Sequence, residues 1–247
     1  LVASCFDNTV GIAGCHGKTT ATAMCAHILE ECSGSCSAHI GGEDFDYCNL
    51  YSGGDKFFVT EACGYMGNFL HLRPDVAVIL NTDADHLECY GDAEQLGTAY
   101  RTYARGAKAA IVCGEDKIAK EVDCALTFGL TKECDVGAEN IRSMNGKYSF
   151  SLRIKGEILD KIKLNVYGKH NIYNALAAAA LAEYYGYDAN LTVRGLQKFR
   201  GIRRRFELLG ELNGAQMIAD YAHHPREIAA ALATAKEVCG GKLFVIF

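Results

Sequence analysis

Phosphate-binding residue types come together in one run, Gly14-Cys15-His16-Gly17-Lys18-Thr19-Thr20. Two glycines allow a tight turn whose backbone N–H groups face an anion, and a helix that begins there adds a partial positive charge. In such a loop Lys18 reaches the terminal phosphates of a nucleotide and Thr19 holds Mg²⁺. The run lacks the first glycine of the Walker pattern, because Ile12 stands at that position. The loop therefore indicates nucleotide binding without specifying a reaction.

Further polar residues stand where a strand end and a helix start would present them. Glu61 follows the apolar run 57–59, which places its carboxylate at the carboxyl end of a strand, where α/β proteins bind ligands. Asn171 and Asn174 lie three residues apart at a predicted helix start, so their carboxamides share one face. A carboxamide both donates and accepts, as the edge of adenine requires. From the residues alone, a solvated strand end for Glu61 and an N-cap for Asn171 remain alternatives.

The loop and these polar residues need a sheet and helices to position them. Between residues 9 and 128, apolar runs typical of strands alternate with helical patterns. This alternation predicts an α/β fold with a mostly parallel sheet. The expected strands are 9–13, 57–60, 76–80, 109–113 and 125–128, and the expected helices are 18–31, 93–105 and a short one near residue 117.

The second half of the chain has different patterns. Residues 136–166 alternate with a period of two around the hairpin signal Asn145-Gly146, which predicts an antiparallel appendage. Helices are expected at 171–185 and 191–199, with a domain boundary near Gly201. Beyond it we expect a hairpin of 206–212 with 216–219, a helix over 225–238 and a strand over 243–247, as the start of a second, incomplete domain.

Composition excludes several classes of protein. The 247 residues are 49% hydrophobic and 22% charged, which is typical of a globular protein. A net charge of -5 argues against a nucleic-acid surface, and the basic run 203–205 is too short to form one. The longest apolar helix candidate, 175–182, falls short of the roughly 20 residues that span a bilayer. Without a secretory signal, and with scattered cysteines, the chain is expected to be cytoplasmic, with no membrane insertion.

Six motifs, in this order along the chain, resemble those of the Mur ligases, ATP-dependent amide-bond-forming enzymes of cell-wall precursor synthesis. They are residues 14–20, 61–63, 81–87, 168–176, 204–207 and 220–225. The resemblance implies a central ATP-binding domain of the P-loop type over residues 1–202. It also implies that residues 203–247 begin a Rossmann-like C-terminal ligase domain.

The resemblance assigns roles residue by residue. It implies catalytic roles for Lys18, Glu61, His86 and Arg205, and a divalent ion, Mg²⁺ or Mn²⁺, on Thr19, Glu61 and His86. A locally bonded loop histidine is the alternative for His86, because Mg²⁺ prefers oxygen ligands. The implied contacts with ATP are the phosphates for the loop and Arg205, adenine for the carboxamide pair and ribose for Asp220. The full set assigned to ATP is Gly14, His16, Gly17, Lys18, Thr19, Thr20, His170, Asn171, Asn174, Arg205 and Asp220.

Within the family, three features are most similar to the members that add L-alanine to UDP-N-acetylmuramate. These features are His16 in the loop, the pair His223-His224 before Pro225, and the sequence of residues 69–72. The implied reaction passes through an acyl phosphate and gives ADP and phosphate. A muropeptide ligase of cell-wall recycling is the close alternative.

A non-catalytic ATP-binding fragment is the third possibility. Cys15 stands where the family usually has threonine, and Gly64 stands where many members have an acid. The family's UDP-binding domain is expected before Leu1, and most of its C-terminal domain after Phe247. Neither lies within this sequence.

Overall fold

The structure is a computed structural model that describes residues 5–82 and 90–247. We call residues 5–202 the main body and residues 203–247 the C-terminal unit. The strands are β1 (Asn8–Ala13), β2 (Cys36–Asp44), β3 (Cys48–Ser52), β4 (Phe57–Glu61), β5 (Val76–Ile79), β6 (Ala109–Cys113), β7 (Leu126–Phe128), β8 (Val136–Met144), β9 (Lys147–Ile154), β10 (Glu157–Tyr167), β11 (Glu207–Leu212) and β12 (Ala215–Ala219). The helices are α1 (Lys18–Ser33), α3 (Ala93–Arg105), α4 (His170–Tyr184), α5 (Ala189–Lys198) and α6 (Pro225–Val238), with 3₁₀ helices η2 (Tyr65–His71) and η3 (Ala119–Glu121).

One mixed sheet organises the main body. In the described part of the chain it has ten strands in the order β10-β9-β8-β7-β6-β5-β1-β4-β2-β3. The strands from β2 to β8 in this order pair in parallel, and both edges are antiparallel, β3 against β2 and β9 between β8 and β10. The predicted α/β fold with a mostly parallel sheet is confirmed.

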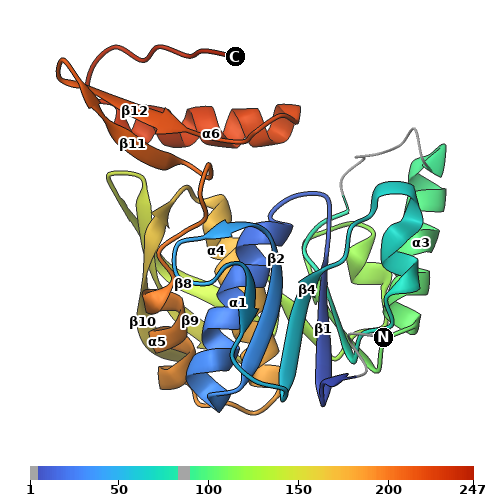
Figure 1. The fold of residues 1–247 in the computed structure, drawn as a ribbon. Coiled ribbons are helices and arrows are strands. Elements are labelled where there is room, and N and C mark those ends of the chain that lie inside the picture. The colour runs from blue at the N-terminus through green and yellow to red at the C-terminus, as the bar shows by residue number, and fades with distance from the viewer. Residues whose placement is uncertain (1–4, 83–89) are drawn as a thin grey trace.

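The central strands are buried on both faces because helices cover both sides of the sheet. Along β1, Val10 and Ile12 pack into a core shared with α1 and α4, whereas Ala13 joins a second core shared with α3. Figure 1 shows α1, α4 and α5 grouped on one side of the sheet and α3 on the other. Burial on both faces explains why these strands appear in the sequence as nearly continuous apolar runs.

The phosphate loop connects β1 to α1 at the carboxyl edge of the sheet. Gly17 has a φ of 83° immediately before the first helical residue, a conformation that glycine adopts without steric cost. Helix α1 is then almost entirely buried from Thr19 to Leu29. The helix N-terminus is therefore fixed in the core and points its N–H groups at the loop.

At one edge of the sheet the sequence patterns predicted the strands correctly, and at the other edge they did not. The predicted hairpin is confirmed, since Asn145 and Gly146 have φ values of 50° and 71° between β8 and β9. These antiparallel strands continue the main sheet directly. Strands β2 and β3 were not predicted, because the glycines and acidic residues near the end of β2 weaken its apolar pattern.

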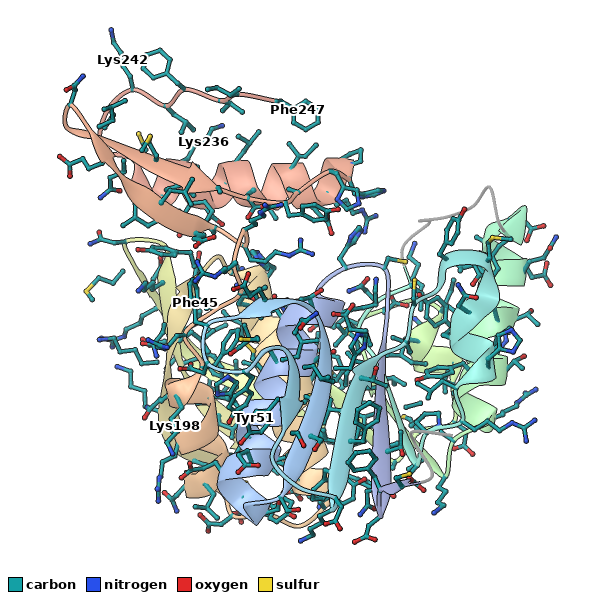
Figure 2. The ribbon with its side chains drawn as sticks, viewed as in Figure 1. Phe45, Tyr51, Lys198, Lys236, Lys242 and Phe247 are labelled. Atoms are coloured by element: carbon teal, nitrogen blue, oxygen red, sulfur yellow. The ribbon has the colours of Figure 1, made fainter. Side chains whose placement is uncertain are left out.

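The C-terminal unit is a separate two-stranded sheet, β11 with β12, followed by α6. The predicted strand over 243–247 is wrong for this structure, in which these residues form no regular element. A strand requires a hydrogen-bonded neighbour, and within the described residues β12 pairs only with β11. In Figure 2, Lys242 and Phe247 lie beyond α6, on the side away from the main body.

The described residues include no helix that is both long and apolar enough to cross a bilayer.

Candidate functional site

A cavity of about 500 Å³ lies between the main body and the C-terminal unit, at the carboxyl edge of the sheet. Residues of the phosphate loop, the ends of β5 and β6, the start of α4 and the start of α6 line it. The predicted site residues that line it are His16, Gly17, Thr19, Thr20, His170, Asn171, Asn174, Arg205 and Asp220. The fold thus brings together residues separated by two hundred positions in the sequence.

The phosphate loop is held in shape by Asn81, at the end of β5. Its Oδ1 accepts from the backbone N–H groups of Cys15 (3.0 Å) and His16 (2.9 Å), and its Nδ2 donates to the carbonyl of His16 (2.9 Å). The sequence analysis assigned Asn81 no role, although Asn81 is the first residue of the motif 81–87 and follows an apolar strand. Its position at a strand end was the available signal.

The loop fits a phosphate group. The first helical hydrogen bond joins the N–H of Ala21 to the carbonyl of Gly17. No described residue accepts a hydrogen bond from the backbone N–H groups of Lys18, Thr19 or Thr20, as expected for the first turn of a helix. A Cβ atom on Gly17 would lie 2.5 Å from Oδ1 of Asn174, so only glycine keeps this approach open.

Lys18 lies over the loop. Its Nζ donates to the carbonyls of Gly14 (2.8 Å) and Cys15 (3.0 Å). The ammonium group is therefore close to the phosphate loop but outside the lining of the cavity.

Two predicted metal ligands lie against neighbouring glycines of β2. Oε1 of Glu61 accepts from the N–H of Gly41 at 2.6 Å, and a Cβ on Gly42 would lie 2.9 Å from Cγ2 of Thr19. A hydroxyl and a carboxylate are suitable ligands for Mg²⁺. His86, the third predicted ligand, lies outside the described residues.

A different set of potential metal ligands, His27, Asp44 and Asp46, has ligand atoms within 4.8 Å of one another. Nε2 of His27 lies 3.4 and 3.3 Å from the carboxylate oxygens of Asp44, and Asp46 pairs with Arg200. Burial alone would raise the pKa of Asp44, but the hydrogen bond to His27 and two backbone N–H groups lower it. None of the three residues lines the cavity, and their mutual bonds account for their positions.

The carboxamide pair is buried at the start of α4. Nδ2 of Asn174 donates to Oδ1 of Asn171 (2.9 Å), and Nδ2 of Asn171 donates to the carbonyl of Tyr167 (2.6 Å). The N-cap alternative for Asn171 is wrong, because α4 begins at His170 and its N-cap is Lys169. Hydrogen bonding fixes both carboxamides at the cavity wall.

His170, beside the carboxamide pair, faces charges from the C-terminal unit. Desolvation lowers its pKa most strongly, and Arg205 acts in the same direction. Asp220 and Glu227 act in the opposite direction. The His170 side chain, which lines the cavity, therefore interacts with charges of both signs on the C-terminal unit.

The C-terminal unit contributes Arg205 and Asp220. The Asp220 carboxylate accepts from the N–H groups of Phe206 and Ala222, both at 2.8 Å, and the Arg205 guanidinium lies 5.5 Å from the ring centre of Tyr221. Each carboxylate oxygen of Asp220 keeps further lone pairs for a ligand hydroxyl.

Glu227, in the first turn of α6, was not predicted as a site residue. Its Oε1 lies 3.2 Å from Nδ1 of His16. Partial burial by itself would raise the pKa of Glu227, but the contacts with His16 and His223 and the charge of Arg205 bring it down to about 2. In the sequence, an acid at this position indicates only a favourable helix start.

The two departures from the family pattern differ in their surroundings. Cys15 is buried, with its Sγ 3.8 Å from the hydroxyl of Tyr100. A Cβ on Gly64 would lie 3.9 Å from the Tyr100 hydroxyl and 4.0 Å from that of Tyr90. The Tyr90 hydroxyl donates to the carbonyl of Gly64. The space beside Gly64 is therefore compatible with a larger side chain.

Comparison with known families identifies the fold. Residues 12–182 match the family described as Mur ligase middle domain. The chain belongs to the Mur ligase family. Residues 204–247 match the family described as Mur ligase, glutamate ligase domain. The resemblance inferred from the motifs is thereby confirmed.

Individual relatives agree with this assignment. The chain is 38% identical to the UDP-N-acetylmuramate--L-alanine ligase of Caldicellulosiruptor bescii over 98% of its own length and 55% of that protein. The structure is similar to that of UDP-N-acetylmuramate-alanine ligase from Thermotoga maritima, with 31% identity and a TM-score of 0.84 over 94% of this chain and 54% of that one. A murein peptide ligase from Psychrobacter arcticus is 25% identical, with a TM-score of 0.74 over 95% of this chain and 55% of that one. The chain spans about half the length of these relatives.

Proposed function

We propose that this Mur ligase chain binds Mg-ATP in the cavity and supplies the ATP-dependent part of a reaction that joins L-alanine to UDP-N-acetylmuramate. The observation that carries the proposal is the cavity itself, where loop residues of the main body meet Arg205 and Asp220 of the C-terminal unit. We assign the loop to the phosphates, Asn171 and Asn174 to adenine and Asp220 to ribose. In this assignment the main body, which ends at residue 202, forms one side of the nucleotide site, and the C-terminal unit, which begins at residue 203, forms the other.

The chemistry of this reaction requires positive charge. A carboxylate must approach the γ-phosphate to form an acyl phosphate, and an amine then displaces phosphate to form the amide. Lys18 and Arg205 would screen the repulsion between the two anions and stabilise the charge that develops on the transferred group. Mg²⁺ held by Thr19 and Glu61 would neutralise further phosphate charge.

The proposed substrates come from the relatives. The Caldicellulosiruptor bescii protein, named for L-alanine ligation, and the Thermotoga maritima protein, named for alanine ligation, are 38% and 31% identical, compared with 25% for the murein peptide ligase. This difference favours L-alanine as the amino acid. We place the reaction in the cytoplasm, where ATP is available.

Calorimetric titration with Mg-ATP tests the nucleotide site. We expect the wild-type chain to bind and Lys18→Ala to weaken binding or turnover by about a hundredfold, as expected for loss of a phosphate clamp. Lys120→Ala is the matched control, because Lys120 is exposed on η3 and does not line the cavity. Equal affinity of the wild type and Lys18→Ala would refute the loop assignment.

A chimera tests the substrates. In it, this chain replaces the matching half of the Caldicellulosiruptor bescii relative. Incorporation of labelled L-alanine into UDP-N-acetylmuramate supports the proposed reaction, and incorporation of a peptide instead supports muropeptide ligation. A folded chimera that binds Mg-ATP but joins neither substrate would identify the chain as a nucleotide-binding fragment.

A further inference from the structure

Helix α6 contacts the main body near both of its ends through a glutamate. Near its start, Oε1 of Glu227 lies 3.2 Å from Nδ1 of His16. Near its end, Glu237 accepts from the hydroxyl of Tyr148 at 2.7 and 3.0 Å and from that of Ser143 at 3.0 Å. Only the first contact reaches the phosphate loop.

The contact between Glu227 and His16 has a definite polarity. The pKa of Glu227, about 2, keeps its carboxylate ionised at working pH, so this group can only accept hydrogen bonds. A hydrogen bond in this contact therefore requires Nδ1 of His16 to be the donor. Both side chains are 17% exposed, so the pair is shielded from most solvent.

His16 is held from both sides of the cavity. Its backbone is fixed by Asn81 in the main body, with bonds of 2.9 Å to its N–H and to its carbonyl. Its ring lies against Glu227 and against the ring of His224, whose centre is 4.7 Å away. One loop residue therefore connects the phosphate cradle with the C-terminal unit.

We propose that Glu227 is a positioning residue that fixes the phosphate loop through His16 and couples the loop to the seating of the C-terminal unit. The coupling part rests on the proposed nucleotide site. In this structure the C-terminal unit is seated over the loop, and its Arg205 and Asp220 line the cavity together with loop residues. A contact that raises the population of the seated form raises the apparent affinity for a ligand that needs both sides.

A double-mutant cycle on Mg-ATP affinity tests the coupling. We expect Glu227→Ala to weaken binding about tenfold, and the double variant with His16→Ala to bind about as weakly as His16→Ala alone. Glu227→Gln keeps an acceptor for His16 and should recover part of the loss. If the effects of His16→Ala and Glu227→Ala multiply, the two residues act independently and the proposal fails.

Glu237→Ala is the matched control on the same helix. It removes the contact with Tyr148 and Ser143 without touching the loop. We expect its effect on affinity to multiply with that of His16→Ala. If only Glu227→Ala is non-additive with His16→Ala, the effect comes from positioning of the loop and not from general loosening of α6.

Amide hydrogen exchange without nucleotide keeps the test independent of the proposed function. Glu227→Ala should accelerate exchange at least threefold in the loop 14–17 and the first turns of α6, whereas Glu237→Ala should affect only the end of α6 and the β8–β9 hairpin. If the variants show this pattern of exchange but the wild-type chain fails to bind Mg-ATP, the proposed function is refuted and the positioning role is supported. Unchanged exchange in a folded Glu227→Ala variant would overturn the positioning role even if Mg-ATP binds.

Discussion

The main body and the C-terminal unit are held in place by different forces. In α4, eleven of fifteen residues are buried, and the helix packs deep in the main core. Of the fourteen residues of α6, all of which the structure describes, Thr234 alone is buried. Hydrophobic burial fixes the main body, whereas the position of the C-terminal unit depends on a few contacts at its surface.

Those surface contacts are mostly polar. Arg203 pairs with Glu43 and Glu237 accepts from the hydroxyls of Tyr148 and Ser143, while the rings of Tyr167 and Phe206 lie 5.2 Å apart. Exposed ion pairs contribute about 0 to 1 kcal/mol each. The chain therefore combines a half of the site that is fixed by hydrophobic burial with a half whose position depends on a few weak contacts.

Truncating one leucine in each region should give the largest contrast. Leu176 in α4 is fully buried, and Leu208 in β11 is 53% exposed. We expect Leu176→Ala to lower the free energy of unfolding by about 2 to 5 kcal/mol and Leu208→Ala by less than about 0.5 kcal/mol. Urea denaturation followed by circular dichroism measures both. Equal losses would show that the C-terminal unit has a core of its own.

A smaller effect is expected at the connection between the regions. Gly201 has a φ of 122°, and a Cβ there would lie 3.3 Å from Cγ1 of Val166. Gly201→Ala should cost about 1 to 2 kcal/mol of stability, because alanine is strained in this conformation. Gly241→Ala is the control, since a Cβ there meets no atom within 4 Å. Thermal melting of the two variants would contradict this account if Gly201→Ala matched the control.

Acidification should produce the smallest effect and act on the seating of the C-terminal unit. The pKa of Glu227 falls from an ordinary value of 4.5 to about 2 in the folded chain. A lowered pKa gives a contribution that is complete above about pH 4.5 and is lost as the pH falls toward 2. Because the pair is only partly shielded from solvent, we expect this contribution to be about 1 kcal/mol.

Amide exchange of α6 between about pH 5 and pH 3 measures this effect, after correction for the intrinsic exchange rate. Among the described residues, His16, His223, Arg205 and His170 are the charged or titratable groups that interact with Glu227. Glu227→Gln should lose the added pH dependence. If Glu227→Gln has the same pH dependence of exchange as the wild type, the effect comes from other carboxylates.

Local patterns predicted the central elements well. The helix predicted over 93–105 and that over 225–238 match α3 and α6 in full, because periodicity and capping residues act within a few turns. Strands β2 and β3 were missed, since their pairing depends on β4 and on each other. The run 243–247 has the composition of a strand but lacks a described neighbour, which composition does not report.

In the candidate site too, local patterns predicted some residues and long-range contacts decided the others. Sequence patterns indicated the loop and the carboxamide pair as candidate site residues, the family resemblance added Arg205 and Asp220, and the roles of all of them remain predictions. They did not identify Asn81 or Glu227, whose importance lies in contacts with the loop across long stretches of chain.

The sequence by itself determined the fold class and the family, because motifs and periodicity are local and survive in any context. It also determined which donors and acceptors are available at the cavity, because these are fixed by residue type. Only the tertiary structure decided that β8 to β10 continue one sheet and that Glu227 reaches His16. Such contacts join residues far apart in the chain, and their formation depends on the packing of the whole molecule.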